Sequence, residues 1–159
     1  MKVTEVRWKD ALAPCPSARS GHRLVTVGGS LLLFGGYTEH RFGDESVGEL
    51  KQEVWCYNIA TEKWKLLVTN EEDFPASTAS CAVASFKSKV IVFGGSGAYF
   101  GRTNSNKIQI LDMETLQWST VQLQGDALQA GYGHSISLTE DGFLYLYGGT
   151  DGQGHVILR

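Results

Sequence analysis

The chain has 159 residues, of which 19% are charged, and its formal net charge at pH 7 is −3. The weak negative charge argues against nucleic acid or an anionic membrane surface as a partner. No stretch approaches the roughly 18 apolar residues of a membrane-spanning helix. The 19 glycines and 3 prolines are typical of an all-β protein with many tight turns.

The N-terminal residues and the cysteines indicate an intracellular protein. Residues 1–5 contain no apolar segment like that of a secretory signal peptide. Cys15, Cys56 and Cys81 are odd in number and widely spaced, so neither a disulfide framework nor a zinc site is expected. Reduced thiols predict a cytoplasmic or nuclear location.

The predicted strands form three successive groups, preceded by a lone strand at residues 1–12 that carries Trp8. No segment has a convincing helical period of about 3.6 residues. The polar residues 37–52 are predicted to form a long loop within the first group, and 96–106 the corresponding loop of the second. The predicted strands are 22–27, 31–36, 53–58 and one beginning at Trp64, then 80–86, 90–95, 107–112 and 118–122, then 133–138 and 143–148.

One motif organises these groups. Four or five apolar residues run into a Gly-Gly pair at Leu31–Gly36, again at Val90–Gly95, and again at Phe143–Gly149. The apolar run predicts a buried strand, and the glycines allow a turn where a Cβ atom would clash. The first glycines of the pairs are 59 and 54 residues apart, a period that indicates a repeat architecture.

Tryptophans recur in step with the glycines. Trp64 follows Gly35 by 29 residues, and Trp118 follows Gly94 by 24. Tyr57 precedes Trp64 by seven residues. Four short strands per unit, with Gly-Gly after the second and Trp opening the fourth, resemble kelch repeats. The resemblance implies a β-propeller.

The number of repeats predicts an incomplete ring, because propellers typically have about four to eight blades. We expect about two and a half blades plus one N-terminal strand, as in a fragment, a short isoform or an incomplete gene model. Residues 1–12 would be an isolated fourth strand of a closing blade. The predicted blades are 13–69 and 70–125, with a partial third blade at 126–159.

Candidate binding residues lie in the loops that enter the first strand or leave the second strand of each blade, where propellers place function. Arginine, serine and tyrosine can hold a carboxylate or a peptide end through fixed donors and a stacking face. For Arg19 and Ser20 the alternative is a structural role in tying blades together. The candidates are Arg19, Ser20, Arg41, Tyr99, Phe100, Arg102 and Tyr132.

We expect no catalytic residues, no metal and no cofactor. His22 and His134 occupy equivalent places in two repeats, so repeat geometry explains them without a metal ligand role. The sequence contains no GxSxG, HExxH or phosphate-binding glycine motif. The glutamates at 45, 49 and 53 are interpreted as a solvated loop face.

Within the kelch proteins, several stretches are similar to substrate receptors of cullin-2 ubiquitin ligases. That resemblance implies binding of C-terminal degrons, often ending in glycine, in the propeller channel. It also implies elongin B/C and cullin-2 as partners, through a segment absent from this sequence, and no catalysis by the chain itself. The similar stretches are 18–23, 34–37, 93–101, 104–106 and 132–134.

Two alternatives stay open. A cytoskeletal or scaffold kelch protein would bind through the outer faces of its blades, without degron binding. A kelch-type enzyme, such as a copper oxidase or an isomerase, would need converging histidine, tyrosine, cysteine or carboxylate ligands. The residues of this chain show no such cluster.

Overall fold

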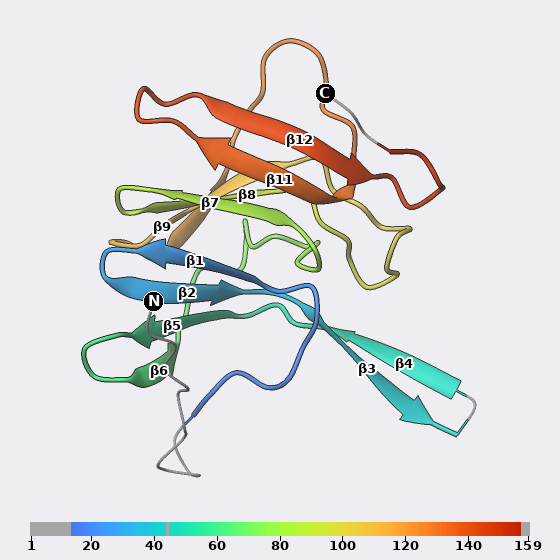
Figure 1. Ribbon diagram of the computed structural model, residues 1–159, viewed down its shortest axis with the longest axis horizontal. Helices are drawn as coiled ribbons and strands as arrows, with labels where there is room; N and C mark the ends of the chain where they lie inside the picture. The colour runs from blue at the N-terminus through green and yellow to red at the C-terminus, as the bar shows by residue number, and fades with distance from the viewer. Residues whose placement is uncertain (1–13, 44, 157–159) are drawn as a thin grey trace, which may run out of the picture.

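The structure is a computed structural model that describes residues 14–43 and 45–156, and it contains strands and turns but no helix in that part of the chain. The predicted lone strand at 1–12, with Trp8, lies outside the described residues. Three antiparallel sheets are stacked one above another in Figure 1, with a separate hairpin projecting to one side. The expected all-β architecture is confirmed.

The first sheet has the strand order β1-β2-β5-β6, so consecutive strands of the blade pair with one another. Its central strand, β2, ends at Phe34, directly before Gly35-Gly36. The four predicted strands of this group are confirmed to within one or two residues. Their bounds are β1 Arg23–Val27, β2 Ser30–Phe34, β5 Val54–Asn58 and β6 Lys63–Leu66.

The second sheet repeats this arrangement in the order β10-β9-β8-β7. The third sheet, in its described part, consists of β11 and β12 alone. All six strands agree with the predicted positions to within two residues. Their bounds are β7 Ala82–Phe86, β8 Lys89–Phe93, β9 Ile108–Asp112, β10 Gln117–Thr120, β11 Tyr132–Leu138 and β12 Leu144–Thr150.

The prediction of a long loop over residues 37–52 was wrong. Strands β3 (Tyr37–Phe42) and β4 (Glu45–Leu50) form an antiparallel hairpin there, which projects from the end of the first sheet (Figure 1). The hairpin sequence has no apolar face, so hydrophobic periodicity gives no sign of its two strands. It forms because its two strands satisfy each other's backbone hydrogen bonds.

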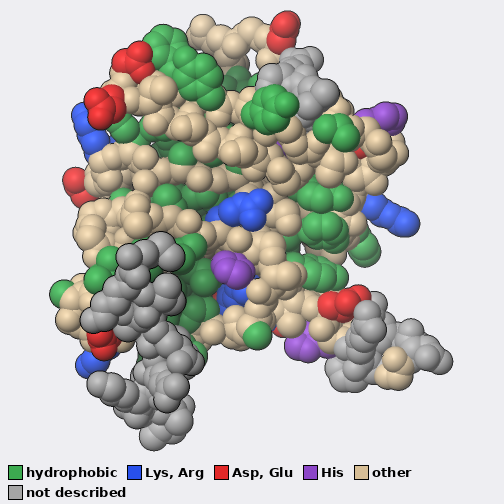
Figure 2. Space-filling view, in the orientation of Figure 1, with side chains coloured by type: hydrophobic (Ala, Val, Ile, Leu, Met, Phe, Trp, Pro, Cys, Tyr) green, Lys and Arg blue, Asp and Glu red, His purple; other side chains and the backbone are tan. Residues whose placement is uncertain are grey.

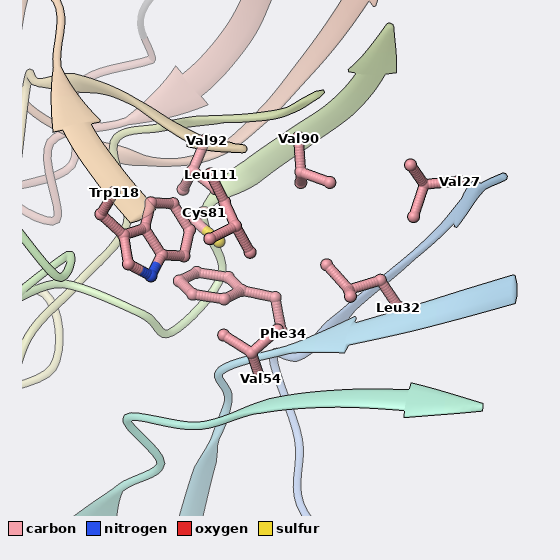
Figure 3. Close-up of a cluster of buried hydrophobic side chains, with 9 residues drawn as sticks. All are labelled: Val27, Leu32, Phe34, Val54, Cys81, Val90, Val92, Leu111 and Trp118. Atoms are coloured by element: carbon pink, nitrogen blue, oxygen red, sulfur yellow. The ribbon is translucent and has the colours of Figure 1, made fainter. Parts of the chain in front are cut away.

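The main hydrophobic core lies between the first two sheets (Figure 3). Leu32 and Phe34 of β2 are fully buried against the second sheet, and the Phe34 ring lies 5.5 Å from that of Trp118. Phe74 completes this cluster of aromatic rings, 5.5 Å from Trp118 and 6.0 Å from Phe34. Burial of each such side chain stabilises the fold by roughly 1.5–3 kcal/mol.

Neighbouring sheets are also joined by a hydrogen-bond pattern that repeats along the stack. The backbone N–H of Ser80 donates to Gly21 O (2.7 Å), and in the next step Gly133 N–H donates to Ser80 O (2.8 Å). Gly36 N–H donates to Thr78 O (3.1 Å), and Gly95 N–H repeats this bond on the following sheet with Gly131 O (2.9 Å). A repeated contact of this kind is what stacked propeller blades require. The described sheets form an open stack that does not close a ring.

The Gly-Gly pair is needed for this stacking. A Cβ atom at Gly35 would lie 2.3 Å from the carbonyl oxygen of Thr78 on the neighbouring sheet, and Gly35 has φ of +61°. Both the close approach and the left-handed backbone exclude a larger residue. The repeated glycines therefore place the ends of adjacent sheets in direct contact, which is where the candidate site lies.

Candidate functional site

A row of three aromatic rings crosses the Gly-Gly ends of all three sheets. Tyr37 begins β3, Phe100 comes from the loop after β8, and Tyr132 begins β11. The ring centroids of Tyr37 and Phe100 are 5.9 Å apart, and those of Phe100 and Tyr132 are 4.8 Å apart. The structure thus brings together two predicted site residues, Phe100 and Tyr132, and adds Tyr37, which the sequence reasoning missed.

A pocket of about 330 Å³ opens beside this row. Aromatic side chains supply its apolar wall, and two serines supply hydroxyl groups. Ser20, a predicted site residue, is exposed, and its hydroxyl lies 3.3 Å from the carbonyl oxygen of Tyr37. The lining residues are Ser20, Gly21, Tyr37, Glu39, Ser80 and Phe100. Figure 2 shows hydrophobic side chains gathered on the side of the molecule from which the β3–β4 hairpin projects.

The loop that carries Phe100 is held by the third sheet and by its own base. The Asn104 amide donates to Gly101 O (3.3 Å) and to Asp151 O (2.7 Å). Gly101 N–H donates to Ser96 Oγ at 2.7 Å. Gly152 packs so closely on Gly101 that a Cβ atom there would lie 2.2 Å from the Gly101 carbonyl oxygen. Phe100, 44% exposed, is therefore a positioned side chain in an ordered loop.

Tyr99 and Arg102 flank a tight turn at the tip of the same loop. Arg102 N–H donates to Tyr99 O at 2.9 Å, which closes the turn. The Tyr99 side chain is 72% exposed, and Arg102 is exposed as well. Neither side chain has a hydrogen bond, ion pair or ring contact with the described residues. Both are accessible for contact with another molecule.

Arg19 is placed differently from the other predicted residues. Its side chain is only 2% exposed, and its guanidinium forms an ion pair with Glu53 at 2.9 Å and donates to Gly35 O at 3.3 Å. Burial opposes ionisation of Glu53, yet hydrogen bonds from Trp55 and Arg19 lower the pKa of that carboxyl overall. These contacts commit Arg19 to holding the start of β1 against the Gly-Gly turn.

Arg41 lies in β3, opposite Ser46 of β4, and its side chain is outside what the structure describes. Three other charged or titratable side chains on or next to the hairpin, Glu49, Lys51 and His40, contact one another. Glu49 accepts from Lys51 at 2.6 Å and contacts His40 at 3.3 Å, and these hydrogen bonds lower the pKa of the Glu49 carboxyl.

His134, which suggested a metal ligand, is buried with 4% exposure and lies edge-on to Phe93 at 5.0 Å between ring centroids. Neither ring nitrogen has a hydrogen-bond partner, and burial lowers the pKa of the imidazole. His22, in the equivalent place, is exposed. Residues 14–43 and 45–156 contain no group of three or more histidine, cysteine, aspartate or glutamate side chains that could hold a metal ion.

Two further grooves, of about 490 and 510 Å³, adjoin each other at the outer part of the second sheet. They share Asp73, Asn106, Lys107 and Thr120. Thr120 Oγ1 donates to Asp73 at 3.0 Å, so part of their polar lining is already bonded. The pocket beside Tyr37 and Phe100 is the better candidate, because it combines an aromatic wall with accessible hydroxyl groups.

Comparison with known proteins agrees with this geometry. The family described as the KLHDC2/KLHL20/DRC7 Kelch-repeats domain matches residues 1–157. The chain belongs to the kelch-repeat family. Kelch repeats account for the recurring Gly-Gly turns, the stacked four-stranded sheets and the tryptophans, and the open stack is an incomplete kelch propeller.

Several curated relatives are Kelch domain-containing proteins. Kelch domain-containing protein 10 of Xenopus tropicalis is 35% identical over 143 residues, which are 86% of this chain and 34% of that protein. The human protein of the same name is 34% identical over 143 residues, 86% of this chain and 31% of its own. Kelch domain-containing protein 2 of Rattus norvegicus is 34% identical over 116 residues, 70% and 28% respectively. This kelch chain thus spans about a third of the length of the relatives it matches.

In the described part of the chain no helix is long and apolar enough to cross a membrane. The kelch chain is a protein-interaction module related to Kelch domain-containing proteins 10 and 2.

Proposed function

We propose that this kelch chain recognises the C-terminal ends of other proteins in the pocket beside Tyr37 and Phe100. In this proposal it is the substrate-recognition part of a cullin-RING ubiquitin ligase. The observation that carries the proposal is the aromatic row Tyr37–Phe100–Tyr132, which crosses three sheets and borders a pocket of about 330 Å³. A rigid aromatic wall with a few polar groups is typical of sites that hold a short peptide segment.

The charges around the pocket support a specific requirement. A C-terminal carboxylate held in this pocket would need a cationic side chain close to it. Arg102 at the loop tip is exposed, and Arg41 lies two positions after Glu39 on β3. Because arginine can bind a carboxylate through two parallel hydrogen bonds, we propose these two residues as the cations that hold the C-terminal carboxylate.

The partners follow from the similarity to substrate receptors and are part of the proposal. Elongin B/C and cullin-2 would dock on a segment outside these 159 residues, and ubiquitin transfer would be carried out by partner subunits. The sequence similarity to Kelch domain-containing protein 10 supports this assignment. Glycine at the end of the bound peptide follows from the same similarity to substrate receptors and is likewise part of the proposal.

The test is a titration of the intact chain with a fluorescent peptide that ends in glycine, carrying either a free or an amidated C-terminus. We expect binding of the free form and at least a tenfold loss on amidation, because the charge-assisted hydrogen bonds disappear. Arg102→Ala and Arg41→Ala should each weaken binding of the free form. Lys65→Ala, which removes a charge from the exposed outer strand β6, is the matched control and should have no effect.

Equal binding of both peptides, or no binding of either across a varied set of peptide ends, would contradict the proposal. Absence of peptide binding together with an interaction that survives substitution of Arg102 would favour the scaffold alternative. In that case the projecting β3–β4 hairpin would be the first surface to examine.

A further inference from the structure

Ser80 has a left-handed backbone conformation, and glycine stands at the equivalent position in each of the two neighbouring sheets. Gly21, Ser80 and Gly133 have φ of +62°, +54° and +75°. The residue before each of them pairs with the residue that follows a Gly-Gly turn: Ser20 with Tyr37, Ala79 with Ser96, and Tyr132 with Thr150. The three positions are therefore structurally equivalent, and one of the three carries a side chain.

The fold itself accounts for the backbone at this position but not for the serine. Ser80 N–H donates to Gly21 O and Ser80 O accepts from Gly133 N–H, so the inter-sheet bonds use only main-chain atoms. Glycine makes the same backbone bonds at the two neighbouring positions. A side chain with positive φ is strained, because its Cβ atom approaches the following carbonyl oxygen.

The Ser80 side chain has no structural task in the described part of the chain. Its hydroxyl forms no hydrogen bond with any described residue, and it lines the pocket next to Gly21. A Cβ atom placed on Gly21 would lie 2.9 Å from Ser80 Oγ, so the hydroxyl occupies the space above that glycine. Strained residues that persist without a structural benefit are concentrated at binding and catalytic sites.

We infer that Ser80 is a ligand-contacting residue whose hydroxyl hydrogen-bonds the polar end of a peptide held in this pocket. This inference rests on the proposed function and deepens it by naming a specificity-determining residue. Ser80 lines this pocket together with Ser20, Tyr37 and Phe100. A hydroxyl there can donate to a carboxylate or to a peptide carbonyl, and it selects for either over an apolar group.

The expected signature is a protein that becomes more stable as its binding weakens. Ser80→Gly relieves the backbone strain, so the Tm should rise by about 2–4 °C. Loss of the hydroxyl should weaken peptide binding about 3- to 10-fold. Ser80→Ala keeps the strain and removes the hydroxyl, so it should weaken binding equally without raising the Tm.

Glu62→Gly is the matched control. Glu62 has φ of +55° in the exposed turn between β5 and β6, away from the pocket. Its replacement should raise the Tm similarly and leave binding unchanged. The probe is a displayed library of random peptides, presented once with free C-termini and once followed by a further amidated segment. The selected peptides are then titrated against the intact chain and the three variants.

Each outcome decides between the two proposals. Binding that needs a free C-terminus and weakens in both Ser80 variants supports both. Binding that is unaffected in both Ser80 variants overturns the role of Ser80 and leaves the proposed function standing. Peptides that bind irrespective of a free end, but weaken in both variants, support Ser80 and overturn recognition of the terminal carboxylate. If no peptide binds, both proposals fall.

Discussion

The apolar strand before the Gly-Gly pair lies in very different surroundings in the first and the third sheet. Leu32 and Phe34, counted back from the first Gly-Gly pair, are fully buried against the next sheet. Tyr145 and Tyr147 hold the same places before the third pair, and they are 62% and 65% exposed. Phe93, the counterpart of Phe34 in the second copy, is 1% exposed and packs on His134 of the third sheet. Within the described residues, the first and second copies therefore have a neighbouring sheet on this face, and the third copy has none.

This difference shows that the apolar run before Gly-Gly encodes an interface between sheets. In repeat proteins each unit contacts only its neighbours, so the stability of a unit depends on the sheet beside it. The tyrosines of β12 carry hydroxyl groups that remain hydrated while exposed, whereas Phe34 has no such group. The same sequence position can therefore be the most important or one of the least important for stability.

The sharpest way to break the comparison is to truncate the equivalent residues Phe34 and Tyr147. Phe34→Ala removes a buried ring that contacts Trp118 and Phe74, and it should lower the free energy of unfolding by about 3–5 kcal/mol. Tyr147→Ala should change it by less than about 0.5 kcal/mol, because the side chain is mostly exposed. Urea denaturation, monitored by tryptophan fluorescence, measures the change in the free energy of unfolding for both variants. Similar losses in the two variants would show that the β12 face is covered in solution.

A second pair of substitutions sharpens the comparison at the glycines. Gly35→Ala places a Cβ atom 2.3 Å from Thr78 O of the neighbouring sheet, at φ of +61°, so we expect a loss of about 2–4 kcal/mol. Gly148→Ala has a similar φ of +72° but no described atom within 4 Å of the new Cβ atom. Its loss should be about 1 kcal/mol, from backbone strain alone.

Thermal unfolding of the two glycine variants beside the wild type provides the measurement. Both variants share the cost of an alanine with positive φ. The difference between their losses of stability therefore measures the cost of the close approach of the two sheets at Gly35. An equally large loss in Gly148→Ala would mean that another segment packs on Gly148, and equal small losses would mean that the first two sheets can move apart.

The elements that the sequence predicted well are those with a strong apolar signal. Strands such as β2 and β8 contain four consecutive apolar residues, most of them buried, that end at glycines, and their positions follow from that pattern. The β3–β4 hairpin was missed because its residues are mostly polar and its two glycines, Gly43 and Gly48, suggested a loop. Its strands are specified by pairing with each other, and pairing leaves no trace in hydrophobic periodicity.

The candidate site was predictable in part for a similar reason. Phe100 and Tyr132 stood out as aromatic residues in loops, and the structure places their rings 4.8 Å apart. Tyr37 could have been found, since it directly follows a Gly-Gly pair where Ser96 and Thr150 stand in the other repeats. Ser80 could not, because the role proposed for it rests on a backbone angle and on the pocket formed around it.

The smallest expected effect concerns pH and the interface between the second and third sheets. His134 of β11 packs edge-on against Phe93 of the second sheet, and burial lowers its pKa below the usual value near 6.5. Above about pH 6.5 the imidazole is neutral in both folded and unfolded chains, so it adds no pH dependence. As the pH falls below that value, the unfolded chain takes up the proton first, and stability is lost. The first interface, around Phe34, contains no such group among its clustered side chains.

Unfolding experiments between pH 8 and pH 5.5 would measure this effect, with His134→Phe keeping a ring against Phe93 while removing the titration. We expect the wild type to lose stability below about pH 6.5 and His134→Phe to lose less, by an amount smaller than either substitution in the first interface. His22→Asn, at the equivalent but exposed position, should behave as the wild type does. A pH dependence that persists unchanged in His134→Phe would assign the loss to another histidine. It would also contradict the conclusion that burial at the second interface makes His134 behave differently from His22, which occupies the equivalent repeat position.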